Sequence, residues 1–216
     1  MKRGVLTVLS GFSGSGKGTI IKKLLSLYPD TYALSISATT RAKRMNEKTG
    51  VYEQDGVDYF FLTREEFEKR IAEDRFIEYA TYNENYYGTP KDYVFECLEK
   101  GLDVILEIEV QGALQIKEKF PDALLIFMTP PDAETLYERL IGRGTETQEV
   151  VQRRMKTAIF ESTLMDRYDY VLVNDTIDEC AEKMHQMVTL AHDRAVCSEK
   201  LIGEIKQQLS QFSFES

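Results

Sequence analysis

A glycine-rich segment near the start of the chain has the residue types and spacing of a phosphate-binding loop. It follows an apolar run, Val5 to Leu9, and precedes apolar residues at helical spacing, so it connects a strand to a helix. Glycines let successive backbone N–H groups curve around phosphate oxygens, the helix N-terminus attracts the same anion, and a lysine adds a full charge. A glycine-rich turn with an incidental lysine is the alternative interpretation. The residues of the predicted loop are Gly11, Phe12, Ser13, Gly14, Ser15, Gly16, Lys17, Gly18 and Thr19.

The position after Lys17 departs from the strict loop pattern. Many such loops place there the serine or threonine that ligates Mg²⁺, whereas this chain has Gly18, and Thr19 comes one residue later. Mg²⁺ gives up its water ligands reluctantly. We therefore expect Mg²⁺ to be held mostly by phosphates and water, with Thr19 as the candidate for a direct protein contact.

Four apolar segments predict the strands that position this loop. They are residues 5–9, 104–106, 124–128 and 170–173, and helical patterns lie between them. Strands that alternate with helices favour a parallel sheet covered on both faces. Between residues 38 and 89 the pattern changes to short aromatic strands and one helix, which begins at the capping box Thr63 to Glu66. We expect that segment to form an inserted lobe.

Several short sequence motifs in the rest of the chain indicate little when each is taken alone, but their combination is specific to one protein family. Taken alone, the basic segment Ser37 to Arg44 and single carboxylates such as Glu78 or Glu109 are best interpreted as solvated surface. In order, and together with the loop, the strings resemble the guanylate kinase family from about residue 5 to residue 175. They are Ser37-Ala38-Thr39-Thr40-Arg41-Ala42-Lys43-Arg44, Asp58-Tyr59-Phe60-Phe61, Phe76-Ile77-Glu78-Tyr79-Ala80, Asn85-Tyr86-Tyr87-Gly88-Thr89, Leu106-Glu107-Ile108-Glu109-Val110-Gln111-Gly112 and Gly142-Arg143-Gly144-Thr145.

The resemblance implies ATP-dependent phosphorylation of GMP to GDP, with Mg²⁺ as the cofactor of ATP and dGMP as a further candidate acceptor. Residues that match those holding the GMP phosphate are Arg41, Arg44, Tyr59 and Tyr87. Residues that match the guanine site are Ser37, Glu78, Thr89 and Glu109, and Glu107 belongs to the same site. Arginines that match those approaching the ATP phosphates are Arg139, Arg143 and Arg154, the last with Arg153 beside it. The predicted catalytic set is Lys17, Arg41, Arg44, Arg139, Arg143 and Arg154.

The chemistry of guanine supports these roles independently. Its Watson–Crick edge presents N1–H and N2–H₂ donors, for which a carboxylate is the natural acceptor. Adenine would leave Glu78 or Glu109 unpaired, so AMP should be rejected strongly. The acceptor phosphate is already an anionic nucleophile, so the reaction needs no general base, only positioning and charge neutralisation.

Three features depart from the family pattern. Glu107 and Glu109 stand where the family often has Asp-x-Asp, which lengthens each side chain by one methylene. Lys48 to Gln54 resembles an insertion, which we expect to lengthen a surface loop at small entropic cost. Phe12 stands where family members commonly carry proline.

The implied fold class is α/β: a P-loop NTPase core with a five-stranded parallel sheet flanked by helices, an inserted mixed α/β GMP-binding lobe and a small helical lid. We expect residues 1–37, 90–130 and 155–216 to form the core, 38–89 the lobe and 131–154 the lid. Bringing two polyanions together implies closure of lobe and lid, with hinges near 37–38 and 89–90, which excludes water.

The composition of the chain limits the kinds of partner that the protein is expected to bind. With 27 Lys and Arg against 36 Asp and Glu, the net charge is −9, which disfavours nucleic acid as a partner. No apolar stretch approaches a membrane span, and no signal peptide is evident at the N-terminus. Cys97, Cys180 and Cys197 are odd in number and widely spaced, which favours thiols in a reducing cytoplasm. The sequence leaves both monomer and homodimer open, and assigns no role to the helix expected after about residue 195.

Two other functions fit parts of the pattern. A non-catalytic scaffold module with the same fold typically lacks an intact phosphate loop, whereas Gly16 and Lys17 are intact here. A kinase that acts on another acceptor, such as a ribose phosphate, would not need paired base-recognising carboxylates.

Overall fold

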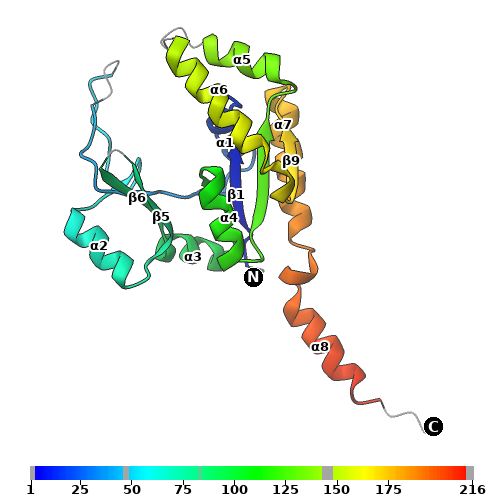
Figure 1. Cartoon of the computed structure of the whole chain (residues 1–216). Helices are drawn as coiled ribbons and strands as arrows, with labels where there is room; N and C mark the ends of the chain where they lie inside the picture. The colour runs from blue at the N-terminus through cyan, green and yellow to red at the C-terminus, as the bar shows by residue number, and fades with distance from the viewer. Residues whose placement is uncertain (1–2, 46–48, 83, 143–147, 213–216) are drawn as a thin grey trace.

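A computed structural model of the chain describes residues 3–45, 49–82, 84–142 and 148–212. Its central sheet has five strands in the order β2-β7-β1-β8-β9, and every neighbouring pair is parallel (Figure 1). The predicted five-stranded parallel sheet is therefore confirmed. The sequence pattern did not identify β2, which is only three residues long. The strands are β1 (Leu6–Gly11), β2 (Tyr32–Leu34), β7 (Asp103–Glu107), β8 (Leu124–Thr129) and β9 (Tyr170–Val173).

Helices cover both faces of this sheet, because side chains of a strand alternate between its two faces. On β1, Leu6 and Val8 belong to a core cluster with α3 and α4, whereas Leu9 belongs to a second cluster with α1 and α7. Both faces are thus buried, as an all-parallel sheet requires. The helices concerned are α1 (Lys17–Leu27), α3 (Lys91–Glu99), α4 (Val110–Lys119) and α7 (Ile177–Ala191).

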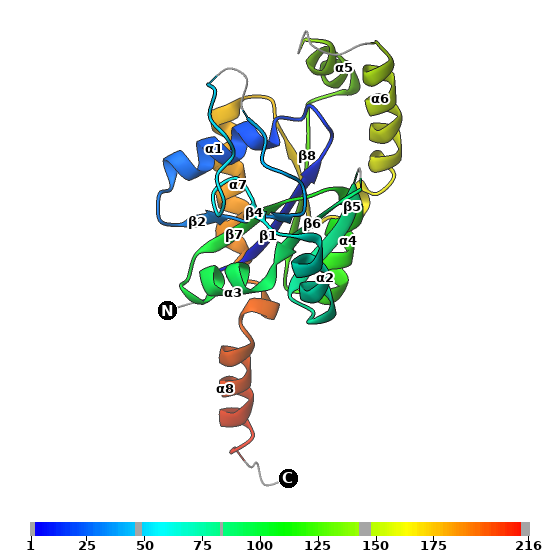
Figure 2. The same cartoon turned by 90° about the vertical axis from the view of Figure 1, so that its left-hand side faces the viewer.

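A second, mixed sheet forms within the segment that the sequence predicted as an insertion (Figure 2). Its order is β4-β3-β6-β5, and helix α2 packs on it through Phe67, which stacks on Phe76 at 4.3 Å between ring centroids. Thr63 and Glu66 form the predicted capping box at the start of α2. The elements are β3 (Ala38–Thr39), β4 (Phe60–Phe61), α2 (Arg64–Ala72), β5 (Phe76–Tyr82) and β6 (Asn85–Pro90).

The remaining helices flank the carboxyl end of the central sheet or follow it in the chain. Helices α5 and α6 lie together at the end where β1 and β8 terminate, and α8 extends away from the opposite end (Figure 1). No helix in the described ranges is long and apolar enough to cross a membrane. These elements are α5 (Ala133–Ile141), α6 (Gln148–Ser162), η1 (Met165–Arg167), η2 (Ala195–Cys197) and α8 (Glu199–Leu209).

Candidate active site

The predicted phosphate-binding loop lies between the carboxyl end of β1 and the first turn of α1. Gly14 and Gly16 have φ angles of 93° and 94°, in the left-handed region that glycine adopts without steric cost. A Cβ atom at Gly16 would lie 2.5 Å from Nδ2 of Asn174, so a side chain there would displace the asparagine. Nζ of Lys17 donates to the carbonyl oxygens of Gly11 (2.7 Å) and Phe12 (3.2 Å), which fixes the ammonium group over the loop.

Residues far away in the sequence hold the loop in place. Nδ2 of the buried Asn174, just after β9, donates to the carbonyl oxygen of Ser15 at 2.7 Å. Arg139, in the last turn of α5, donates to the carbonyl oxygen of the same asparagine at 3.0 Å. Arg154 of α6 donates to Oγ of Ser13 at 2.8 Å. Two of the predicted ATP-side arginines are therefore anchored on or beside the loop.

A polar cavity of about 420 Å³ opens in front of the loop. Its walls include the ammonium-bearing side chains of Lys17 and Lys22, which give it a positive charge. Glu107, the last residue of β7, also lines it. The loop residues that line it are Ser13, Gly14, Gly16, Lys17, Gly18 and Thr19. This arrangement suits a polyphosphate whose negative charge faces the loop amides and lysines.

A second cavity of about 480 Å³ lies between the two sheets, and Glu107 lines this one as well. Two further carboxylates face it: Glu78 from β5, and Glu109, the N-cap residue of α4. The predicted residues that share this cavity are Ser37, Glu78, Tyr87, Glu107 and Glu109. Because Glu107 borders both cavities, a ligand in one lies next to a ligand in the other.

The structure places Thr89 behind Glu78 rather than on the cavity wall. Thr89 is fully buried in β6, and its hydroxyl donates to Oε1 of Glu78 at 2.7 Å. Burial raises the pKa of Glu78, and the charge of Glu109 adds to this effect, while the hydrogen bond from Thr89 lowers the pKa. Thr89 therefore fixes the orientation of the carboxylate and favours its charged form.

The arginine and tyrosines predicted for the acceptor phosphate form a cluster at one side of this cavity. The guanidinium of Arg41 lies over the ring of Tyr59 at 5.2 Å, and Tyr59 meets Tyr87 edge to face at 6.2 Å. Both terminal nitrogens of Arg41 donate to the carboxylate of Glu53 at 2.8 Å. The pKa of Arg41 is raised mainly by these hydrogen bonds, and the pKa of Glu53 is lowered by them. The guanidinium is thus fixed in charge and in orientation.

Several other predicted residues, among them Arg44, Phe12 and Ser15, do not line either cavity. Arg44 is exposed, and its backbone N–H donates to Glu53 at 2.8 Å. Phe12 packs into the core, with its ring edge to face against Phe127 at 4.9 Å. Ser15 is buried inside the loop. Arg143 lies outside the described residues.

Three residues near the site were not predicted from the sequence. Glu53 lies in the segment interpreted as a surface-loop insertion, where one carboxylate in an acidic chain gives no signal. Asn174 directly follows a core strand at the carboxyl edge of the sheet, a position that could have drawn attention to it. Half-buried Glu161 of α6 has a pKa raised by burial and, to a smaller extent, by Glu109, while the charge of Lys17 lowers it.

The donor set beside the loop fits Mg²⁺. Thr19 and Glu107 both line the phosphate cavity and offer oxygen ligands, the kind that Mg²⁺ prefers. Among the described residues there is no cluster of three or more His, Cys, Asp or Glu side chains that could enclose an ion.

The parallel sheet, the loop at the end of β1 and the second cavity beyond Glu107 define a P-loop nucleotide-binding protein. The guanylate kinase family model matches residues 3–191, so the chain belongs to the guanylate kinase family. The guanylate kinase of Streptococcus pneumoniae is 48% identical over 207 residues, covering 96% of this chain and 95% of the relative. That of Streptococcus agalactiae is 50% identical over 202 residues, covering 94% and 92%. The crystal structure of guanylate kinase from Anaplasma phagocytophilum superimposes with a TM-score of 0.67 at 32% identity, covering 91% of this chain and 90% of that one.

Proposed function

We propose that this enzyme transfers the γ-phosphoryl group of ATP to GMP, the reaction of its family, by holding one nucleotide in each of the two cavities. The observation that supports this most directly is that Glu107 lines both. Phosphates on the loop then face a cavity whose far wall carries the base-recognising carboxylates Glu78 and Glu109. dGMP presents the same base edge and phosphate, so we include it as a second acceptor.

In this mechanism the residues of the chain bind, orient and neutralise charge. Arg41, Arg44, Tyr59 and Tyr87 hold the acceptor phosphate, whose own oxygen attacks, so no side chain has to remove a proton. Lys17 and the loop amides bind the donor phosphates and stabilise charge on the transferred group.

The predicted lid arginines complete the donor side of the site. Arg139 and Arg154 are anchored beside the loop by Asn174 and Ser13, from where they can reach the donor phosphates. Arg143, which lies outside the described residues, belongs to the same proposed set. Bound with ATP, Mg²⁺ would neutralise further negative charge on the donor phosphates, and Thr19 and Glu107 are the residues that would hold it, directly or through water.

The proposed hinges for closure of the lobe onto the core coincide with the two places where the chain passes between the two sheets. One passage, at residues 37–38, leads into the start of β3, and the other, at residues 89–90, is the end of β6 directly before α3. We assign residues 1–37, 90–130 and 155–216 to the core, 38–89 to the GMP-binding lobe and 131–154 to the lid. Closure would exclude water from the transferring phosphoryl group.

A reducing, cytoplasmic setting fits the thiols of the core. Cys97 and Cys180 are buried in the two core clusters, and burial raises the pKa of Cys180 to about 11. Buried thiols of this kind are inert packing groups, which are common in reducing compartments.

The test is an ADP-release assay with Mg·ATP across GMP, dGMP, AMP, CMP, UMP and ribose phosphates. Adenine would leave two carboxylates unpaired, which costs about 2–6 kcal/mol, or roughly 30-fold to 2 × 10⁴-fold in kcat/KM. In the double variant Glu78→Gln and Glu109→Gln we expect this preference for GMP over AMP to shrink sharply. Glu118→Gln, an exposed carboxylate of α4, is the matched control and should leave base choice unchanged.

Three outcomes would contradict the proposal. A ribose phosphate preferred to GMP would indicate a different acceptor class. A folded protein without ADP release would indicate a binding module. Unchanged base choice in the double variant would show that the two glutamates do not recognise guanine.

A further inference from the structure

One face of helix α6 points inward and carries two charged side chains. This face is formed by residues at steps of three, four and three along the helix: Val151, Arg154, Ala158 and Glu161. Val151 and Ala158 are buried in the same core cluster as Phe12 of the phosphate-binding loop. Arg154 and Glu161 are half-buried. The helix therefore directs an arginine and a carboxylate toward the region of the loop.

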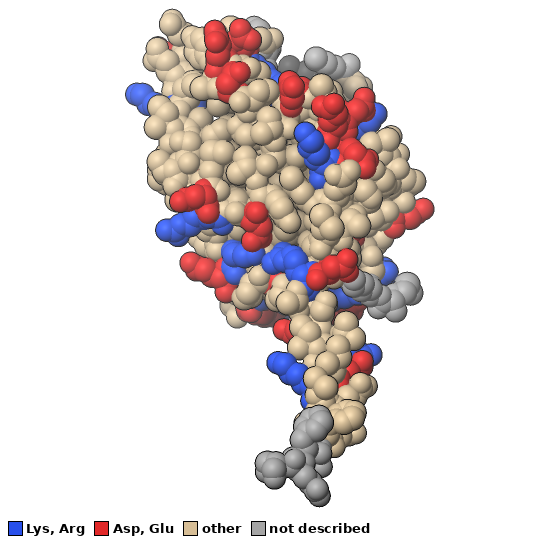
Figure 3. Space-filling view, turned by 90° about the vertical axis from the view of Figure 1, so that its right-hand side faces the viewer, with Lys and Arg blue, Asp and Glu red and all other residues tan. Residues whose placement is uncertain are grey.

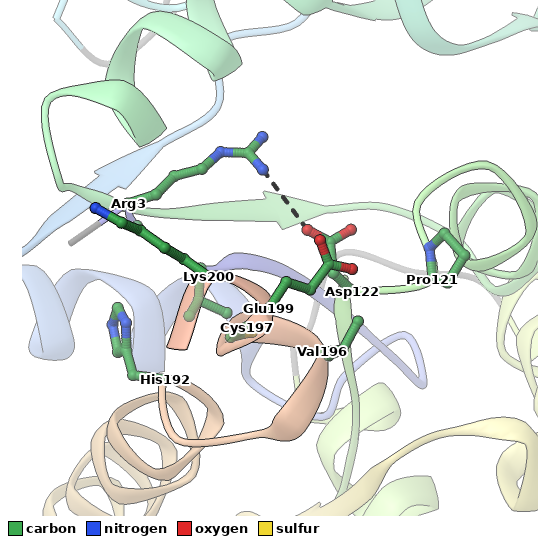
Figure 4. A pocket seen from close by; sticks show the side chains of 10 residues that line it. Arg3, Pro121, Asp122, His192, Val196, Cys197, Glu199 and Lys200 are labelled. Carbon is green, nitrogen blue, oxygen red and sulfur yellow. Dashed lines mark ion pairs between the residues drawn. The ribbon is translucent and has the colours of Figure 1, made fainter. Parts of the chain in front are cut away.

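The inward position of Glu161 is unusual for a carboxylate. Charged side chains normally lie at the surface, and Figure 3 shows many of them on one face of this protein. At the base of the molecule Arg3 pairs with Asp122 beside a cavity, and these side chains are 55% and 42% exposed (Figure 4). On α6 the outer positions are instead taken by apolar residues, since Ile159 and Phe160 are 66% and 52% exposed. Partial burial of a carboxylate costs free energy, so Glu161 needs compensating partners.

Three groups from three other elements act on Glu161. Burial raises the pKa of Glu161, the charge of Lys17 in the first turn of α1 lowers it, and the charge of Glu109, the N-cap residue of α4, raises it. The pKa of Tyr168, just before β9, is raised to about 12, mainly by burial and also by the charge of Glu161. Of these three neighbours only Lys17 is a cation, so it is the one that stabilises the ionised carboxylate.

Two buried hydroxyl groups lie on the core side of this carboxylate. Ser10 of β1 and Tyr168 face each other closely enough for the serine hydroxyl to lower the pKa of Tyr168, but no hydrogen bond of good geometry joins them. Neither hydroxyl has another hydrogen-bond partner among the described residues. A buried hydroxyl without an acceptor costs free energy. Glu161 is the carboxylate whose charge reaches Tyr168, so it is the acceptor that this hydroxyl can use.

The lysine of the loop is oriented by neutral groups. Nζ of Lys17 donates to the carbonyl oxygens of Gly11 and Phe12 at 2.7 and 3.2 Å. These oxygens fix the ammonium group without neutralising its charge. Glu161 adds a negative charge nearby, and it is also close enough to Glu109, in the wall of the second cavity, to be affected by its charge. The attraction of Glu161 therefore draws the ammonium group toward the second cavity.

We propose that Glu161 is a positioning residue for Lys17: its carboxylate, supported from behind by the hydroxyl of Tyr168, directs the lysine ammonium at the phosphoryl group that is transferred. Glu161 lines neither cavity, so it acts through the lysine and not on a nucleotide. This inference rests on the proposed phosphoryl transfer to GMP, in which Lys17 stabilises charge on the transferred group. Only the ionised form of Glu161 can attract the ammonium group.

The substitution Glu161→Gln tests this role, because it keeps the shape of the side chain and removes the charge. In an ADP-release assay with GMP and Mg·ATP, kcat should fall by about tenfold, while the KM for GMP stays within about twofold. Glu149→Gln, an exposed carboxylate in the first turn of the same helix, is the matched control and should retain the wild-type kcat. A wild-type kcat in Glu161→Gln, or a rise in the KM for GMP in place of the fall in kcat, would overturn the proposal.

A double variant separates positioning of Lys17 from a contribution to the stability of α6. In the Lys17→Ala background there is no ammonium group to direct, so Glu161→Gln should lower the remaining kcat by less than about twofold. A full tenfold loss in that background would show that Glu161 acts independently of Lys17 and would overturn the proposal. A folded wild-type protein without GMP-dependent ADP release would instead refute the proposed function itself.

The pH dependence of kcat, at saturating GMP and ATP, is the readout that a purely structural role would not change. In the wild type kcat should fall as the pH decreases through the raised pKa of Glu161, and in Glu161→Gln this fall should be absent. Tyr168→Phe removes the supporting hydroxyl, so the fall should move to higher pH. Tyr170→Phe, in β9 and 38% exposed, is its matched control. A fall that persists in Glu161→Gln, or that Tyr168→Phe leaves in place, would overturn the proposal.

Discussion

The hydrogen bond from Thr89 to Glu78 allows a sharp test of how the guanine-facing carboxylate is positioned. Thr89→Val keeps the shape of this fully buried side chain and removes the hydroxyl that donates at 2.7 Å. A hydrogen bond to a charged group contributes about 1.5–3 kcal/mol, which corresponds to roughly 12-fold to 140-fold in binding. We expect the KM for GMP to rise by about tenfold or more, while kcat stays within about threefold, because the acceptor phosphate site is untouched.

The pH dependence of the same variant gives a second readout. The bond from Thr89 lowers the pKa of Glu78, against burial and the charge of Glu109, which raise it. Guanine binding needs the ionised carboxylate, so affinity is present above the pKa and lost as pH falls through it. Without the hydroxyl the pKa rises further, and the acid limb of kcat/KM for GMP should move to higher pH.

The measurement is an ADP-release assay at saturating ATP, with GMP varied from about pH 5 to about pH 8, around the range where a raised glutamate titrates. Thr7→Val is the matched control: Thr7 is buried in β1, and its hydroxyl has no hydrogen-bond partner among the described residues. It should leave the KM and the acid limb unchanged. If Thr89→Val also coincides with wild type in both, Thr89 does not position Glu78 for guanine.

Two further substitutions test the donor and acceptor phosphate sites. Lys17→Ala removes the ammonium group above the loop and should lower kcat by about 10²–10³, as loss of a transition-state donor does, while circular dichroism shows a folded protein. Lys22→Ala in the same cavity should cost less than about tenfold, and wild-type turnover in Lys17→Ala would refute the role. Glu53→Gln removes the charge that holds Arg41 at 2.8 Å through both terminal nitrogens and should raise the KM for GMP by about fivefold or more. Glu68→Gln, on the exposed side of α2, is its control, and tighter GMP binding in Glu53→Gln would show that the pair restrains Arg41 instead of preparing it.

The strands that carry a continuous apolar run were predictable, and β2 was not. Residues of β1 and β8 are buried on both faces, so composition alone marks them as interior strands. The strand Tyr32–Leu34 pairs with β7 at the edge of the sheet, and its last residue is exposed. Its three residues are therefore too few and too mixed in burial to show an apolar pattern in the sequence. Its place depends on the backbone of β7, about 70 residues further along the chain.

The sequence by itself determined the features that depend on neighbouring residues. The loop needs its glycines, its lysine, the strand before it and the helix after it, all within one short segment, and the capping box needs only Thr63 and Glu66. Local geometry of this kind is set by backbone conformation and by side chains a few positions apart, so the pattern is visible in the chain.

Only the tertiary structure decided which groups support the chemistry. Asn174 donates to the carbonyl oxygen of Ser15 across 159 positions, Glu53 pairs with Arg41 from a loop, and Thr89 lies behind Glu78 instead of facing the cavity. Hydrogen bonds and ion pairs act over a few ångströms of space, whatever the separation along the chain. A single carboxylate or amide therefore acquires its role only when the two sheets fold and bring its partner within that range.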